Sequence, residues 1–141
     1  MIDFIDETKT CSFSEEVVTV LEKLMLYLEL NDKELCLVFV NDKKMHELNL
    51  ANRQVDSATD VLSFPTVEPE DVDMPSIPFL GDIIISLDTA EKQAKEQGLE
   101  TKDEVKVLAA HGLTHLLGFD HPDEASWEVF KSNQTKILEL S

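Results

Sequence analysis

The stretch HGLTHLLGFDH, residues 111–121, contains three of the four histidines of the chain. His111 and His115 are four residues apart, so on a helix they lie one above the other on the same face. Gly118 stands where helices commonly end, because glycine adopts the left-handed backbone conformation at little cost. The chain can then turn and bring His121 towards the first two histidines. This stretch therefore predicts a helix with a cluster of three histidines at its C-terminal end.

Histidines at this spacing are suited to bind one metal ion. We predict His111, His115 and His121 as ligands of one Zn²⁺ per chain, with nickel, copper or iron as alternatives. Three histidines with no further protein ligand in the stretch fit an open site that carries a water molecule. Three unrelated, solvated histidines are the disfavoured alternative. Asp120 either supports a ligand histidine by a hydrogen bond or is an ordinary loop or capping residue.

The spacing of this stretch is also that of the metzincin proteases, so the predicted histidine helix is zincin-like. Those enzymes carry a glutamate, their general base, directly after the first histidine. Here that position is Gly112, which cannot accept a proton. A metalloprotease-like hydrolase is therefore a weak alternative, although a zinc-bound water can attack other substrates.

The apolar pattern outside this stretch predicts an alternation of strands and helices. Strands are expected at 2–5, 34–41, 60–65 and 80–87, helices at 16–30, 43–53, 89–98, 101–118 and 122–140, and an acidic, proline-containing loop at 66–79. Ser12, Asp42 and Asp88 precede three of the helices and are candidates to cap them. The order predicts a single α+β domain over residues 1–141, with helices packed on a small mixed sheet.

The composition limits the partners and the location of the protein. The net charge of −17 argues against nonspecific nucleic-acid binding, which usually needs a basic surface. No stretch approaches the roughly 18 apolar residues of a membrane span, and the first residues do not resemble a signal peptide. Two cysteines without a secretory signal favour a reducing compartment. We therefore expect a soluble, cytoplasmic protein that does not contact membranes.

Three stretches together resemble the YbeY family of bacterial metal-dependent endoribonucleases. They are HGLTHLLGFDH at 111–121, HELNLANRQVDSATDVLSFP at 46–65 and LGDIIIS at 80–86. The similarity covers most of residues 46–128. The family usually has tyrosine where this chain has Asn52, proline at Ala58 and tyrosine at Phe119, and none of these differences affects the predicted metal ligands.

The resemblance implies an α+β fold and cleavage of single-stranded RNA. It further implies a role in small-subunit rRNA maturation and in ribosome quality control. The metal ligands of the family correspond to His111, His115 and His121, and its functional arginine corresponds to Arg53. A ribosomal protein and a ribosome-assembly GTPase are implied as partners by the family alone, and the sequence does not determine the oligomeric state.

Arg53 is the only arginine of the chain. Its planar guanidinium suits a phosphate and can stabilise the charge that builds up during RNA cleavage. The alternative is an ordinary helix-end arginine that interacts with C-terminal carbonyls. Lys43 and Lys44 can add to a local phosphate groove. His46 shares a helix face with Arg53 and either contacts the substrate, transfers a proton or is a partly exposed histidine without a function.

A non-catalytic ribosome-associated factor, in which the metal only stabilises the fold, is a further alternative. Such a closed site needs a fourth protein ligand. His46 and Asp120 are the nearby candidates for that fourth ligand.

Overall fold

The computed structural model describes residues 2–30, 32–65, 79–119 and 124–141. The elements are β1 (Ile2–Asp6), α1 (Ser14–Tyr27), β2 (Glu34–Val40), α2 (Asp42–Arg53), β3 (Val61–Pro65), β4 (Phe79–Ser86), α3 (Leu87–Gln97), α4 (Thr101–Leu116) and α5 (Glu124–Glu139). This order confirms the predicted α+β class. The predicted acidic loop, apart from Phe79, lies outside the described residues, as do Asp120 and His121.

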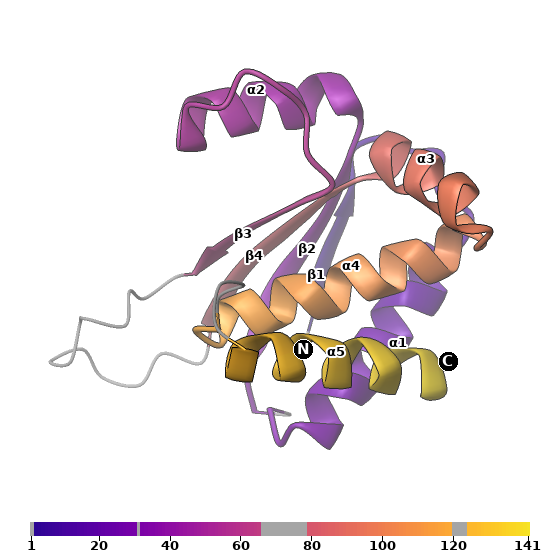
Figure 1. Ribbon diagram of the computed structural model, residues 1–141, viewed down its shortest axis with the longest axis vertical. Helices are drawn as coiled ribbons and strands as arrows, with labels where there is room; N and C mark the ends of the chain where they lie inside the picture. The colour runs from indigo at the N-terminus through magenta and orange to yellow at the C-terminus, as the bar shows by residue number, and fades with distance from the viewer. Residues whose placement is uncertain (1, 31, 66–78, 120–123) are drawn as a thin grey trace, which may run out of the picture.

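The strands form one mixed sheet in the order β1-β2-β4-β3. The neighbours β1, β2 and β4 are parallel, whereas β3 runs antiparallel to β4 at the edge of the sheet. Because β2 and β4 are parallel neighbours, the two helices that follow them, α2 and α3, begin side by side (Figure 1).

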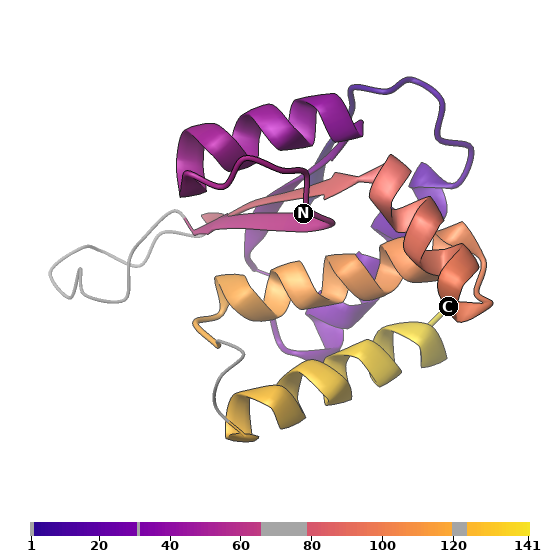
Figure 2. The same cartoon turned by 45° about the horizontal axis from the view of Figure 1, so that its top comes forward.

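Both faces of the sheet are covered by helices. Side chains alternate along a strand, so Leu37 and Phe39 of β2 face the main core with α1 and α4. Val38 and Val40 point the other way and pack in a smaller cluster with Met45 of α2. Figures 1 and 2 show α2 on one side of the sheet and α1, α4 and α5 on the other.

The central helix of the main core is α4, which contacts α1, α3, α5, β3 and β4. Gly112 of this helix lies directly against Ile83 of β4. A Cβ atom at position 112 would be only 2.6 Å from Cγ2 of Ile83, so a glycine is needed for the helix to approach the sheet this closely.

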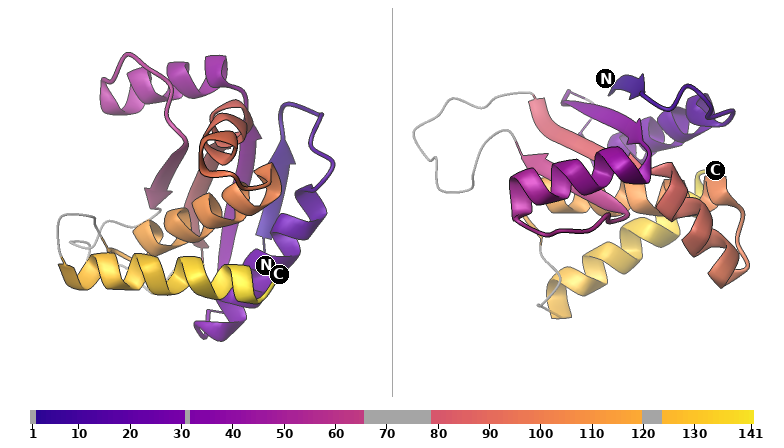
Figure 3. Two further views of the ribbon diagram at one scale, coloured as in Figure 1. Left: turned by 45° about the vertical axis from the view of Figure 1, so that its right-hand side comes forward. Right: turned by 90° about the horizontal axis from the view of Figure 1, so that it is seen from above.

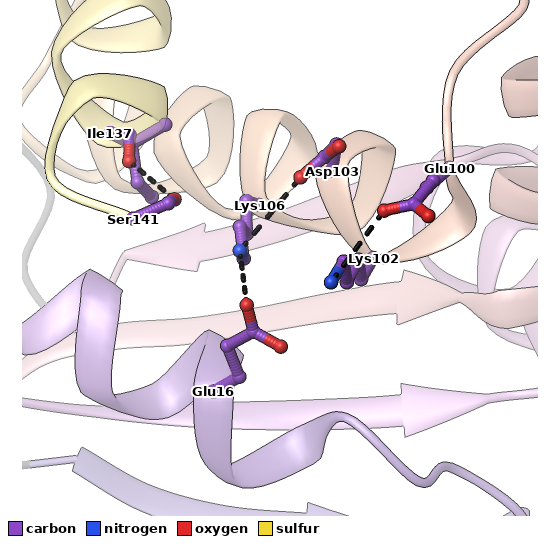
Figure 4. A network of polar contacts seen from close by, with 7 residues as sticks. All are labelled: Glu16, Glu100, Lys102, Asp103, Lys106, Ile137 and Ser141. Carbon is purple, nitrogen blue, oxygen red and sulfur yellow. Dashed lines mark hydrogen bonds and ion pairs between the residues drawn. The ribbon is translucent and has the colours of Figure 1, made fainter.

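An ion pair between the buried Lys106 and the exposed Glu16 joins α4 to α1 (Figure 4). Lys106 of α4 is only 1% exposed, and its Nζ lies 2.8 Å from Oε1 of Glu16 and 3.8 Å from Oδ1 of Asp103. The hydrogen bond and the positive charge of Lys106 lower the pKa of the Glu16 carboxyl. The sequence did not indicate this pair, because the two partners are 90 residues apart.

The predicted capping residue of α1 was wrong. This helix begins at Ser14 after Phe13, and no side chain caps it, so Ser12 does not cap it.

The caps of α2 and α3 are also shifted from the prediction. Asn41 caps α2 by accepting a hydrogen bond from the Lys44 amide, and Ser86 caps α3 in the same way. Asp42 instead accepts hydrogen bonds from the Ser86 hydroxyl at 2.6 Å and from Thr89. Asp88 accepts the backbone amide of Asp42 at 2.9 Å. The two aspartates therefore tie the helix N-termini to one another.

Within the ranges described, no helix combines the length and the apolar character that crossing a membrane requires. The cytoplasmic location stays a prediction from the sequence.

Candidate functional site

His111 and His115 lie on consecutive turns of α4, as their spacing predicts. Both side chains are partly exposed, whereas the helix positions around them are mostly buried. Both imidazole rings meet the ring of Phe130 on α5 edge-on, with centroid separations of 5.5 Å for His111 and 4.8 Å for His115. The two histidines are therefore held on the same side of α4, where they can act together.

Gln134 of α5 contacts the first of these histidines. Its Oε1 lies 2.8 Å from Nε2 of His111, so the ring nitrogen donates and the amide oxygen accepts. A ring nitrogen that donates a hydrogen bond carries a proton, which is lost when that nitrogen binds a metal ion. The contact with Gln134 thus helps to orient the His111 ring.

A buried hydrogen-bond chain fastens α5 to α4 next to the histidines. Thr114 donates from its hydroxyl to the carbonyl of Ala110 at 2.8 Å and accepts from Nδ2 of Asn133 at 2.9 Å. These α5 contacts were not predicted from the sequence. The spacing of Phe130, Asn133 and Ile137, which recur every three to four residues, was the available signal for an inward-facing side of α5.

The turn after α4 has the predicted character. The helix ends at Leu116, and Gly118 adopts a φ of 99°, in the left-handed region. The third predicted ligand, His121, lies outside the described residues. Among the residues that the structure does describe, no three His, Cys, Asp or Glu side chains gather as a metal site. The described part of the chain thus contains two of the three predicted ligands.

Arg53 and His46 lie on α2, which covers the opposite face of the sheet from α4. Figures 1 and 2 show that α2 and α4 both run towards the end of the molecule where β3 ends, with the edge strand β3 between them. Arg53 is in the last turn of α2, and His115 is in the last turn of α4. The fold therefore directs both candidate groups to one end of the molecule from two sides of the sheet.

Arg53 is exposed and, within the described part of the chain, makes no hydrogen bond or ion pair. Its guanidinium is thus available to an external anion. His46 differs, because its Nε2 lies 2.5 Å from Oδ1 of Asp56. His46 is therefore engaged on the α2 side of the sheet rather than with the histidines of α4.

Asp60 and Glu104 form an acidic pair beside this region. Asp60 accepts hydrogen bonds from the Val61 amide at 2.8 Å and from Nε2 of Gln93 at 3.3 Å. Glu104 of α4 is buried, and its burial, followed by the charge of Asp60, raises its pKa. Glu104 was not predicted as a site residue from the sequence.

The position of Gly112 bears on the protease alternative. A glutamate there, as in metzincins, would need a side chain where Ile83 already stands 2.6 Å from an ideal Cβ. The packing of α4 on β4 therefore excludes the protease base for a steric reason as well as a chemical one.

Comparison with known proteins identifies the family of this chain. The family model described as Endoribonuclease YbeY matches residues 2–141. The chain belongs to the endoribonuclease YbeY family. Endoribonuclease YbeY of Thermus thermophilus is 48% identical over 120 residues, which cover 85% of each chain. Endoribonuclease YbeY of Bacillus pumilus is 38% identical over 150 residues, covering 99% of this chain and 93% of the relative.

The fold of this chain is also seen in an experimental structure. The solution structure of a Thermotoga maritima protein matches with a TM-score of 0.68 at 28% identity, covering 99% of this chain and 90% of that one. Membership of the YbeY family confirms the resemblance in the three sequence stretches. It also confirms the predicted enzyme class, an endoribonuclease.

Proposed function

We propose that this chain is a metal-dependent endoribonuclease that cleaves single-stranded RNA during maturation of the small-subunit rRNA and in ribosome quality control. The observation that carries the proposal is the pair His111 and His115 on consecutive turns of α4, in a chain whose family model spans residues 2–141. The ribosome, a ribosomal protein and an assembly GTPase are partners that the family implies, and the cytoplasm is the expected location.

The donor set suits one transition-metal ion. His111, His115 and His121 would hold it, with Zn²⁺ as the first candidate because imidazole ligands suit zinc. Both described rings face the side of α4 next to Phe130, which supports a shared ion. When bound, such an ion acts as a Lewis acid and lowers the pKa of a water molecule.

Side chains of the protein would supply phosphate binding and proton transfer. Arg53, exposed and free of carboxylate partners in the described residues, would hold the scissile phosphate and stabilise its growing negative charge. The attacking group is either a water or a ribose hydroxyl. His46, oriented by Asp56, is the candidate for contact with the substrate or for proton transfer.

Because the net charge of the chain is −17, RNA should bind where its phosphates can reach the positive charge of Arg53. RNA affinity should fall as salt is raised, and Arg53→Ala should reduce the logarithmic salt slope by about 1. Binding without any salt dependence would remove the phosphate contact from the proposal.

The direct test is cleavage of a single-stranded rRNA fragment by the wild type, Arg53→Ala, Arg53→Lys and His115→Ala, with metal content measured in each preparation. Arg53→Ala should keep its metal and lose activity, and Arg53→Lys should recover only part of it, since lysine cannot bind phosphate in a bidentate manner. His115→Ala should lose both metal and activity. Equal cleavage by all four preparations would identify a contaminating nuclease and favour a structural role for the metal.

A further inference from the structure

The chain folds back directly after Arg53. Gln54 adopts a left-handed conformation with a φ of 60°, which reverses the backbone at the end of α2. We call residues 54–60 the return segment, because they run back along α2 to the start of β3. The position of Arg53, at the pivot between α2 and the return segment, depends on how firmly the two are joined.

Asn49 makes two of the contacts that join them. Its backbone carbonyl accepts a hydrogen bond from the Val55 amide at 3.4 Å, and its side-chain Nδ2 donates to the carbonyl of Ser57 at 2.8 Å. Asn49 lies one helical turn before Arg53 and is only 2% exposed. One buried residue therefore holds the return segment at two points on either side of Asp56.

The other polar atom of the Asn49 amide, Oδ1, is buried and receives no hydrogen bond from any of the described residues. A buried acceptor without a donor lowers stability, and an apolar side chain of the same shape would avoid this cost. Stability alone therefore does not explain an asparagine at this position. Its Nδ2 group, by contrast, holds the return segment through the hydrogen bond to Ser57.

We propose that Asn49 is a positioning residue for Arg53. By clamping the return segment to the last turn of α2, it fixes the backbone from which the guanidinium reaches the phosphate. This inference rests on the role of Arg53 in the proposed function. A group that acts in the transition state loses most of its effect when it is displaced by about 1 Å, so loosening the clamp should lower kcat.

The test uses Asn49→Leu, which keeps the branched shape and removes the donor, and Asn49→Ala as a second variant. The matched control is Asn52→Leu on the same helix. Asn52 is exposed, and its Nδ2 donates to the Leu48 carbonyl of its own helix at 2.9 Å rather than to the return segment. Each variant is made in the wild-type and in the Arg53→Ala background. The readouts are kcat and KM on single-stranded RNA, bound metal and melting temperature.

We expect Asn49→Leu to lower kcat at least tenfold with little change in KM, metal content or melting temperature, and Asn52→Leu to change none of these. In the Arg53→Ala background, Asn49→Leu should cause no further loss, because both changes remove the same interaction. The positioning role alone would be overturned if Asn49→Leu lowered kcat equally in both backgrounds. It would also be overturned if Asn49→Leu were fully active while Arg53→Ala was inactive. Full activity of Arg53→Ala would overturn the assignment of Arg53 itself, and the role of Asn49 with it.

Discussion

Adding a single methyl group at Gly112 tests the link between the packing of α4 and the histidine site. The new Cβ of Gly112→Ala would lie 2.6 Å from Cγ2 and 3.2 Å from Cγ1 of Ile83, which is fully buried in β4. Non-bonded carbon atoms prefer a separation of about 3.5–4.0 Å, so α4 and β4 would have to separate by about 1 Å at this point. His111 precedes Gly112 directly and would move with the helix.

Two opposing effects determine the stability of Gly112→Ala. Overpacking a core typically costs about 1–3 kcal/mol, whereas alanine in place of glycine inside a helix gains about 1 kcal/mol. We therefore predict a net destabilisation of about 1 kcal/mol. A shift of about 1 Å in a site residue can lower activity by about 100-fold, so activity should fall much further than stability.

Urea unfolding and RNA cleavage measure the two effects separately. Ile83→Ala removes the clashing atoms, and in that background Gly112→Ala should stabilise the protein by about 1 kcal/mol, the gain in helix propensity alone. This reversal of sign is the decisive observation. If Gly112→Ala in the otherwise unchanged protein is more stable than the wild type and equally active, the close contact between α4 and β4 does not control the site.

Three further predictions concern the contacts of α4, each measured by urea unfolding. Lys106 lowers the pKa of Glu16 below its ordinary value of 4.5. This pair should therefore stabilise the protein above that pH, and the contribution should be lost as the pH falls through the folded-state pKa. Glu16→Gln should flatten the curve of stability against pH between pH 7 and 3. The contribution of Glu104 to stability depends on pH in the opposite direction. Burial raises the pKa of Glu104, so the folded protein is most stable while this carboxyl is protonated, and that stability is lost as the pH rises through the folded-state pKa. Glu104→Gln should therefore be more stable than the wild type at neutral pH, and the difference should be smaller in acid. Asn133→Ala removes the buried hydrogen bond to Thr114 and should cost about 1–3 kcal/mol. An unchanged urea midpoint at neutral pH for Asn133→Ala, or unchanged pH profiles for the two glutamate variants, would contradict the contact concerned.

Local patterns in the sequence were sufficient to predict the helices and strands and to place two of the predicted metal ligands on one helix. Runs of apolar and β-branched residues identified the strands, and the four-residue spacing of His111 and His115 placed both on one side of a helix. Gly118 marked the end of that helix, since a left-handed residue was needed there. These features depend on neighbours within a few residues, which a single sequence displays.

The helix caps show what local patterns could not supply. Asp42 and Asp88 each stand where a cap is expected, yet each bonds across to the start of the other helix. This exchange exists because β2 and β4 are parallel neighbours in the sheet, although their register partners Val40 and Ser86 are 46 positions apart in the sequence. Strand order is a long-range property, so the capping residues could not be assigned from the sequence.

The relation between Arg53 and the histidines was hidden for the same reason. Both groups were recognised from their motifs, but the sequence does not reveal that α2 and α4 cover opposite faces of the sheet. The need for glycine at position 112 likewise depends on Ile83, a residue of a distant strand. Motifs identified the chemical groups, and the topology determined from which sides they approach.

Removing and restoring the metal tests the central claim most directly. The wild-type protein is stripped with a chelator, dialysed, and assayed on single-stranded and duplex rRNA fragments before and after stoichiometric zinc is returned. The account predicts that the stripped protein remains folded but does not cleave, that zinc restores cleavage of the single-stranded RNA, and that the duplex stays intact. Undiminished cleavage by stripped protein that contains no measurable metal would contradict a metal-dependent endoribonuclease built on the histidines of α4.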